Sequence, residues 1–167
     1  MEKQLNRIAK NLQESIENTF NNEPTGICYL TGHCMTEILN TMGYKNKKVT
    51  GKLALKYKNM DKYAVYGKLK GSDVGDYHTW CEVYSEGEIY IVDASLKYNK
   101  KALKDLFNIK LSDKIPNILV TDERNTFNWK YIQEDNLESK SLFFLHKISD
   151  SIIQRIISNT LEKSNPI

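Results

Sequence analysis

The sequence of 167 residues is poor in cysteine and contains no long apolar segment. Three cysteines, an odd number, do not form a complete disulfide framework, so free thiols in a reducing compartment are expected. Because no run of about 18 apolar residues is present, we expect no membrane-spanning helix and no membrane partner. The first twenty residues carry acids, amides and lysines instead of an apolar signal-peptide core. The sequence therefore predicts a cytoplasmic protein and leaves open export that uses no classical signal peptide.

An excess of charge of one sign is also lacking. The 24 basic and 21 acidic side chains leave a net charge of +3, which is too balanced to predict a nucleic-acid partner. No Gly-rich phosphate loop and no Cys-x-x-Cys pair is found, so we predict no cofactor and no metal. Soft ligand atoms for zinc are nevertheless available at Cys28, His33, Cys34, His78 and Cys81. What is present, 40% hydrophobic and 27% charged residues with ten tyrosines, is typical of a folded globular domain.

Hydrophobic spacing predicts helices near both ends of the chain and strands between them. Residues 4–20 and 148–161 carry apolar side chains at helical spacing. Residues 33–42 repeat the pattern, and Gly43 ends it as a C-terminal cap. Strands are expected at 49–55, 63–69, 77–84 and 89–93, with a short helix at 100–107. This order predicts an α+β fold in which N-terminal helices pack on an antiparallel sheet, with a C-terminal helix.

Three side chains have the chemistry of a cysteine nucleophile with its base. Cys34 is predicted in or just before the first turn of a helix, where free amides and the helix dipole favour a thiolate. His78 and Asp93 are predicted on the two strands of one hairpin, within cross-strand reach. Imidazole can take the thiol proton, and a carboxylate can orient the imidazole. The three together predict a catalytic triad.

The chain resembles the transglutaminase-like superfamily of papain-fold proteins. The resemblance rests on Gly32-His33-Cys34, Gly43, Val49-Thr50-Gly51, His78-Thr79-Trp80-Cys81-Glu82-Val83 and Val92-Asp93-Ala94. It implies a papain-like fold, a triad of Cys34, His78 and Asp93, and a thioester intermediate. We expect one transglutaminase-like domain over 1–167, with a core at about 26–98 that carries the match and a C-terminal extension at 99–167.

The sequence departs from the papain-like pattern upstream of Cys34. Relatives place a glutamine about six residues before the nucleophile as an oxyanion donor, and position 28 here is a cysteine. Cys28 and Trp80 are weaker candidates for contacts with the substrate or the oxyanion, and Trp80 on the strand of His78 could shield the imidazole from water. Cys28 is also the rival nucleophile, although no helix is predicted to start there.

These residues predict a cysteine-dependent enzyme that attacks an amide carbonyl through a Cys34 thioester. Hydrolysis, as in a protease, amidase or glutamine deamidase, is favoured over transglutamination because no calcium loop is present. One alternative is an acyltransferase that uses a thioester donor, and another is a binding module that keeps the fold without turnover. A protein or peptide substrate is expected, and the oligomeric state is left open.

Overall fold

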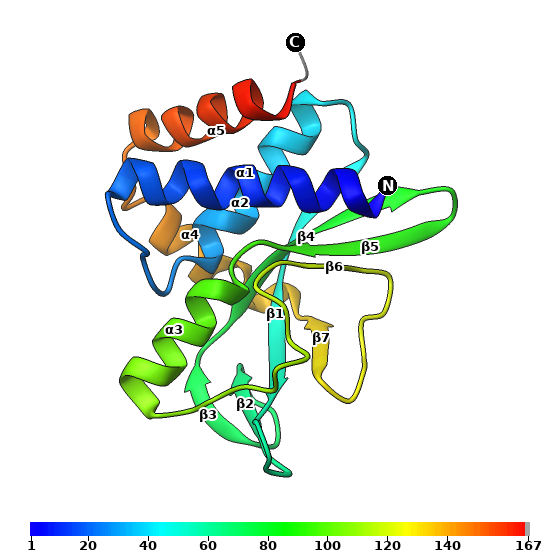
Figure 1. Ribbon diagram of the computed structural model, residues 1–167, viewed down its shortest axis with the longest axis vertical. Coiled ribbons are helices and arrows are strands. Elements are labelled where there is room, and N and C mark those ends of the chain that lie inside the picture. Colours follow the sequence, from blue (N-terminus) through cyan, green and yellow to red (C-terminus); the bar gives the residue numbers. More distant parts are fainter. Residues whose placement is uncertain (166–167) are drawn as a thin grey trace.

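One seven-stranded sheet and five α-helices make up residues 1–165, the part of the chain that the computed structural model describes (Figure 1). The last two residues of the predicted domain lie outside this part. The helices are α1 (Glu2–Phe20), α2 (Cys28–Thr41), α3 (Leu96–Phe107), α4 (Glu138–Leu145) and α5 (Asp150–Ser164), with a short 3-10 helix η1 (Asp135–Leu137) before α4. No helix within residues 1–165 is long and apolar enough to cross a membrane.

The sheet is mostly antiparallel and confirms the predicted α+β class. Its strands are β1 (Asn46–Lys56), β2 (Tyr63–Tyr66), β3 (Ser72–Gly75), β4 (His78–Ser85), β5 (Glu88–Asp93), β6 (Leu119–Thr121) and β7 (Trp129–Gln133). Their order is β3-β2-β1-β4-β5-β6, β7 also pairs with β1, and only the β2–β3 pair is parallel. Cys81 of β4 pairs with Val92 of β5, so His78 and Asp93 lie diagonally across the predicted hairpin.

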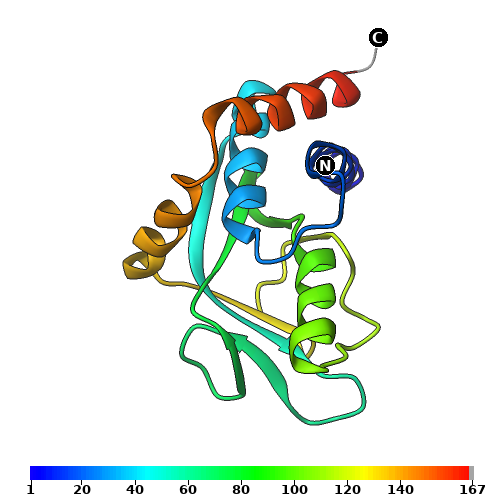
Figure 2. The same ribbon diagram turned by 90° about the vertical axis from the view of Figure 1, so that its left-hand side faces the viewer.

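The buried side chains form two clusters, one on each face of β4. Cys81 and Val83 belong to the cluster that packs against α1, α2 and α5, which gather at one end of the molecule (Figures 1 and 2). Trp80 belongs to the other cluster, which includes side chains of β1 and α3. Since side chains alternate along a strand, His78 and Trp80 lie on one face of β4, and Cys81 lies on the other.

The start of α2 differs from the prediction. The expected helix covered 33–42 and so began after Gly32, but α2 begins at Cys28 and runs through Gly32. A Cβ atom on Gly32 would lie 2.6 Å from Cγ2 of Thr79, so the glycine lets the helix backbone approach β4. Tertiary packing therefore explains why a glycine stands at this position of the helix.

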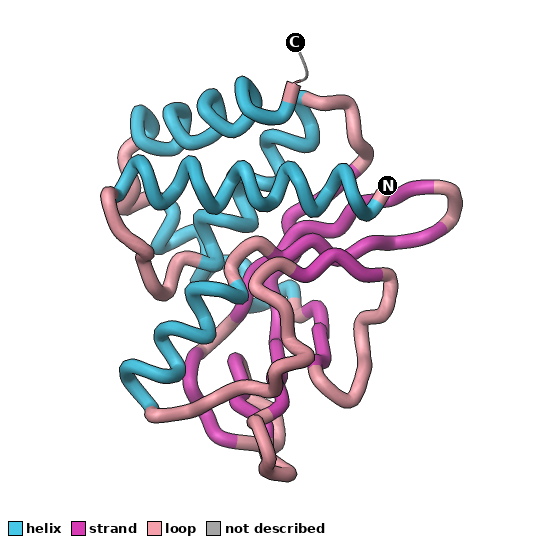
Figure 3. The backbone as a smooth tube through the Cα atoms, in the orientation of Figure 1, coloured by secondary structure: helices cyan, strands magenta, loops and turns pink. Residues whose placement is uncertain are grey.

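The C-terminal extension contributes to both layers of the fold. Its strand β7 extends the sheet along β1 with Leu53 opposite Tyr131, and α5 lies beside α1 (Figure 3). A hydrogen bond from Asn11 to Ser164 and an ion pair between Lys163 and Glu14 join the two helices. The extension therefore brings Tyr131 into the interior, where it reaches the predicted catalytic group.

Candidate active site

His78 and Asp93 lie together in the interior, as the hairpin predicted. Nε2 of His78 is 2.7 Å from Oδ2 of Asp93, and both side chains are at most 1% exposed. The Nδ1 atom of His78 has no hydrogen-bond partner within the described residues. The carboxylate therefore fixes one ring nitrogen, and the other nitrogen remains free for a reacting group.

The Asp93 carboxylate is held by three further donors. The hydroxyl of Tyr131 donates to Oδ2 at 2.7 Å. The backbone amide and the hydroxyl of Ser95 donate to Oδ1 at 2.9 and 2.6 Å. With His78, the carboxylate has four partners, so its orientation and its charge are both stabilised. Tyr131 and Ser95 were not among the residues selected from the sequence.

The pKa values of the pair move apart in the way an ion pair requires. Burial lowers the pKa of His78, but the Asp93 carboxylate and the neighbouring Cys28 thiol outweigh burial and raise it to about 10. Burial raises the pKa of Asp93, but the charge of His78 and the hydrogen bonds from His78 and Ser95 outweigh this and lower it. The resting pair is therefore an imidazolium and a carboxylate at neutral pH.

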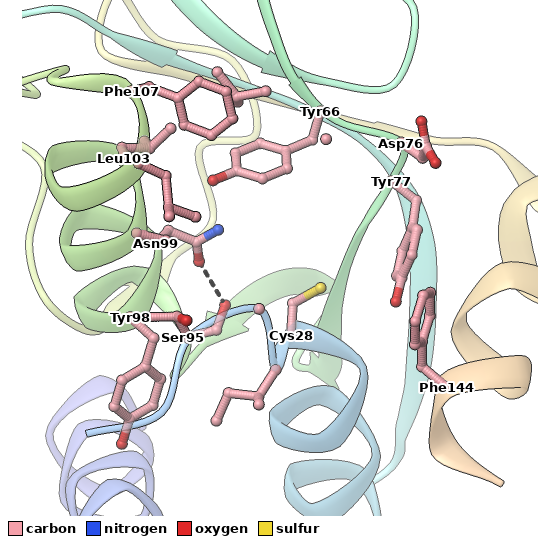
Figure 4. A pocket seen from close by; sticks show the side chains of 17 residues that line it. Cys28, Tyr66, Asp76, Tyr77, Ser95, Tyr98, Asn99, Leu103, Phe107 and Phe144 are labelled. Atoms are coloured by element: carbon pink, nitrogen blue, oxygen red, sulfur yellow. Dashed lines mark hydrogen bonds between the residues drawn. The ribbon is translucent and has the colours of Figure 1, made fainter. Parts of the chain in front are cut away.

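Cys28 is the cysteine that the fold brings to His78. It is the first residue of α2, with Ile27 as the N-cap, and it is half-buried. The first amides of α2 that donate within the described residues are those of Leu30 and Thr31, both to the carbonyl of Ile27. The amides of Cys28 and Tyr29 are thus left for another acceptor. Figure 4 shows the Cys28 sulfur turned into an open space.

Cys34 does not lie where the sequence interpretation placed it. The expectation that it opens a helix is wrong, since α2 begins six residues earlier. Six residues of α-helix separate the two cysteines by about 9 Å along the axis and turn them to different faces. Cys34 is 0% exposed and packs in the same cluster as Cys81, on the face of β4 opposite to His78. Burial, with a smaller effect of Glu37, raises the pKa of the Cys34 thiol to about 12.

Trp80 supports the imidazole but is not available as an oxyanion donor. Its ring stacks on the His78 ring with centroids 6.3 Å apart and is 0% exposed, which fits the expected shielding from water. Its indole N–H donates to Oε1 of the buried Glu82 at 3.2 Å. Arg124 neutralises the same carboxylate at 2.7 Å. The tryptophan is therefore a packing partner whose polar atom is already used.

A cavity of about 300 Å³ opens beside the Cys28 sulfur (Figure 4). Its walls come from the start of α2, from α3, from the ends of β2 and β3, and from Phe144 of α4. Asn99 is a buried amide of this cavity, and its Oδ1 atom lies 3.1 Å from the hydroxyl oxygen of Ser95, whose proton is donated to Asp93. Burial raises the pKa of Tyr66, against a hydrogen bond with Asn99 that lowers it. Ser95 thus links the Asp93 carboxylate to a polar part of the cavity wall.

The residues that sequence reasoning missed lie far from the motif. Ser95 and Asn99 are on the segment after Asp93 and four residues apart, a helical spacing that places them on one face. No local pattern in the sequence points to Tyr131, because only the pairing of β7 with β1 brings it to Asp93. Within residues 1–165, no three His, Cys, Asp or Glu side chains are grouped to hold a metal ion.

Comparisons with known proteins establish the fold alone. A crystal structure of a structural-genomics protein is similar to this chain, with a TM-score of 0.61 and 14% sequence identity. The similarity covers 97% of this chain and 78% of that protein. No protein-family model and no curated protein sequence matches the chain. The architecture therefore has a precedent, and the chemistry has to be argued from the side chains.

Proposed function

We propose that this protein is a cysteine-dependent acyl-transfer enzyme in which Cys28, not Cys34, is the nucleophile. His78 is the acid and base, and Asp93 orients it. The observation that carries the proposal is the position of His78, with one ring nitrogen 2.7 Å from Asp93 and the other without a partner beside Cys28. This is the arrangement that nucleophilic catalysis by a thiol requires.

The position of Cys28 at a helix start is the second support. The positive end of the α2 dipole and the unpaired amides of the first turn favour negative charge on the sulfur. We propose that the thiol proton rests on Nδ1 of His78, so that a thiolate faces an imidazolium. The sulfur is then the polar partner of the buried Nδ1 atom, which has no other hydrogen-bond partner within the described residues.

The first step forms a thioester. The thiolate of Cys28 attacks the carbonyl carbon of an amide, and a C–S bond forms while the carbonyl oxygen becomes an oxyanion. The amides of Cys28 and Tyr29 are candidate donors to this oxyanion, because neither has a partner within the described residues. The C–N bond then breaks, and His78 gives its Nδ1 proton to the leaving amine.

The second step releases the acyl group. His78, now neutral, takes a proton from a water molecule, and the hydroxide attacks the thioester carbonyl. The C–S bond breaks, a carboxylic acid leaves, and the sulfur and His78 return to their starting protonation. Asp93 keeps its four hydrogen bonds throughout, so the imidazole changes charge without turning.

The proposal keeps for His78 and Asp93 the roles that the resemblance to the transglutaminase-like superfamily implies. It moves the role of the nucleophile from Cys34 to Cys28. We favour hydrolysis of an amide over transfer to an amine. The acyltransferase and the non-catalytic binding module are the outcomes that the following experiment separates.

Trapping of the acyl-enzyme tests the proposal. The protein is mixed with p-nitrophenyl acetate, quenched with acid, and analysed by intact mass and peptide mapping. We expect an acetyl group on Cys28 and steady release of p-nitrophenol. His78→Asn is expected to slow acylation at least about 100-fold, which is the range for loss of a general acid or base.

Cys28→Ala and Cys34→Ala form the matched pair. Loss of the adduct in the first variant and its retention in the second support the proposal, and the reverse result overturns it. Equal reaction of the protein and of His78→Asn indicates a surface thiol in a binding module. An adduct that forms from acetyl-CoA, and whose acyl group passes to an added amine in preference to water, indicates the acyltransferase.

A further inference from the structure

Tyr131 brings a second hydrogen-bond donor to the carboxylate oxygen that bonds to His78. Oδ2 of Asp93 lies 2.7 Å from the Tyr131 hydroxyl and 2.7 Å from Nε2 of His78. The two donors of Ser95 bond to the other oxygen, Oδ1. The phenol therefore shares its acceptor atom with the imidazole, and Ser95 does not.

Packing fixes the tyrosine ring beside the imidazole. Tyr131 is 2% exposed, and its ring lies edge-on to the rings of Trp80 and His78, with centroid separations of 5.1 and 6.1 Å. Its backbone pairs with Leu53 of β1, and its amide donates to the carbonyl of Arg124 at 3.0 Å. The position of β7 therefore holds the hydroxyl at the carboxylate.

The phenol remains a hydrogen-bond donor at neutral pH. Burial and the charge of the Asp93 carboxylate raise the pKa of Tyr131 well above its ordinary value of about 10. The O–H dipole thus keeps its positive end directed at Oδ2, close to the ring of His78. A positive end at this place stabilises the carboxylate and opposes a positive charge on the neighbouring imidazole.

We propose that Tyr131 is a positioning residue that limits the proton affinity of His78, so that the imidazolium can release its proton to the leaving amine. This inference rests on the proposed function, in which His78 gives up a proton in the first step and takes one from water in the second. An imidazole bonded to an unshared buried carboxylate oxygen would hold its proton more tightly and would be a weaker acid. The C-terminal extension thus acts on the base through one hydroxyl group.

The titratable groups around His78 decide how the inference is tested. Within residues 1–165, those that face its ring are Asp93 of β5, Tyr131 of β7, Cys28 of α2 and Tyr66 of β2. Burial raises the pKa of Tyr66, so both phenols remain neutral. With alanine in place of Cys28, Asp93 is the ionised neighbour that remains, and His78 titrates without coupling to a thiol.

A pH titration of the Cys28→Ala protein, followed by NMR of ¹⁵N-labelled histidine, measures the pKa of His78 directly. Adding Tyr131→Phe is expected to raise this pKa by about 0.5–1 unit, the size expected for one hydrogen bond. The proton on Nε2 is expected to move to lower field at neutral pH, because its bond to Oδ2 strengthens. The signals of His33 and His146 serve as internal references.

A second change at the same position is expected to act in the opposite direction. 3-Fluorotyrosine in place of Tyr131 keeps the hydroxyl and makes it a stronger donor, so the pKa of His78 is expected to fall. Tyr98→Phe is the matched control, since Tyr98 is also buried and its hydroxyl donates to the Glu17 carboxylate at 3.1 Å. We expect Tyr98→Phe to lower the stability of the fold and to leave the pKa of His78 unchanged.

The acyl-enzyme formed from p-nitrophenyl acetate supplies the kinetic test with Cys28 intact. Its hydrolysis requires neutral His78, so the rate rises with pH to a plateau. We expect Tyr131→Phe to move the midpoint of this rise to higher pH, which slows hydrolysis about 3- to 10-fold below the midpoint. The plateau is expected to be unchanged or higher, because the neutral imidazole is a stronger base.

The outcomes separate this inference from the proposed function. An unchanged or lowered pKa of His78 in Tyr131→Phe, or an equal shift in Tyr98→Phe, overturns the role of Tyr131 and leaves the catalytic assignment in place. A hydrolysis midpoint that does not move also overturns it. The expected NMR shifts in a protein that forms no acyl-enzyme support the control of His78 by Tyr131 and count against the proposed function itself.

Discussion

Cys28 and Cys34 lie on the same helix, six residues apart, and in contrasting environments. Cys28 begins α2, is half-buried, neighbours His78 and faces a cavity. Cys34 is 0% exposed among apolar side chains of α1 and α5, and the pKa of its thiol is raised to about 12. A helix end exposes free amides and a dipole, whereas the second turn offers saturated backbone and packing.

The difference teaches that the position of a thiol within its helix decides its chemistry. Leu30, Cys34 and Ile38 are spaced four residues apart and are all buried, so they form one apolar stripe. Cys34 is a member of this stripe and behaves as a small apolar side chain. Cys28 is the first residue of the helix, directly after the loop around Gly26, and it lies beside His78, the first residue of β4.

The largest expected effect is a difference in thiol reactivity within the native protein. At pH 7.5, a thiol with a pKa of about 12 has a thiolate fraction below about 10⁻⁴, and the buried sulfur of Cys34 is also out of reach. We expect iodoacetamide to label Cys28 at least about 1,000-fold faster than Cys34. Peptide mapping of the native and the urea-unfolded protein measures the ratio. Comparable labelling rates for Cys28 and Cys34 in the native protein would contradict this prediction.

A second prediction concerns the pH dependence of the protein's stability that results from His78, the neighbour of Cys28. Folding raises the pKa of His78 to about 10. The contribution of His78 to the free energy of unfolding is therefore fully present below about pH 6.5 and is lost as the pH rises toward 10. We expect the free energy of unfolding to fall over this window, by up to about 1.4 kcal/mol per pH unit. Urea denaturation from pH 6 to 10 measures the slope.

Asp93→Asn is the matching variant, because it removes the charge that raises the pKa of His78. Its slope between pH 6.5 and 10 is expected to be smaller than that of the unchanged protein. The lowered pKa of Asp93 gives the opposite dependence in acid, where stability is lost as the pH falls below about 4. Burial raises the pKa of Cys34 and of Cys81 in both proteins, so their contribution cancels in the difference.

The smallest expected effect lies between the two cysteines, at Gly32. An added Cβ would lie 2.6 Å from Cγ2 of Thr79, whose hydroxyl lies 3.2 Å from those of both Thr50 and Ser141 and so limits its rotation. Gly32→Ala is therefore expected to lower the free energy of unfolding by about 1–2 kcal/mol, since overpacking outweighs the helix propensity of alanine. Thermal or urea unfolding measures this change.

Thr79→Ser sharpens the test, since it deletes Cγ2 and keeps the hydroxyl. In this background, Gly32→Ala is expected to be neutral or to stabilise by up to about 1 kcal/mol, the helix propensity difference between the two residues. A loss of the same size in both backgrounds would contradict the account of how α2 is held against β4.

Much of the fold followed from local patterns. The amphipathic spacing of the first and last helices, and the hairpin that carries His78 and Asp93, depend on side chains close in sequence. Strand β7 and the hydrogen bond of Tyr131 to Asp93 could not be predicted in this way, because they depend on pairing with a segment more than seventy residues earlier. The extension at 99–167 therefore contributes Tyr131 to the site, although this residue lies outside the motif.

The sequence by itself determined the α+β class and the pairing of His78 with Asp93, because a two-residue period and a short turn dictate the alternation and register of a hairpin. The tertiary structure decided where α2 begins, and with it which cysteine meets the imidazole. The physical reason is tertiary packing: α2 runs through Gly32, where an added Cβ would lie 2.6 Å from Cγ2 of Thr79, so the helix lies close against β4 along a stretch for which the sequence predicted no helix.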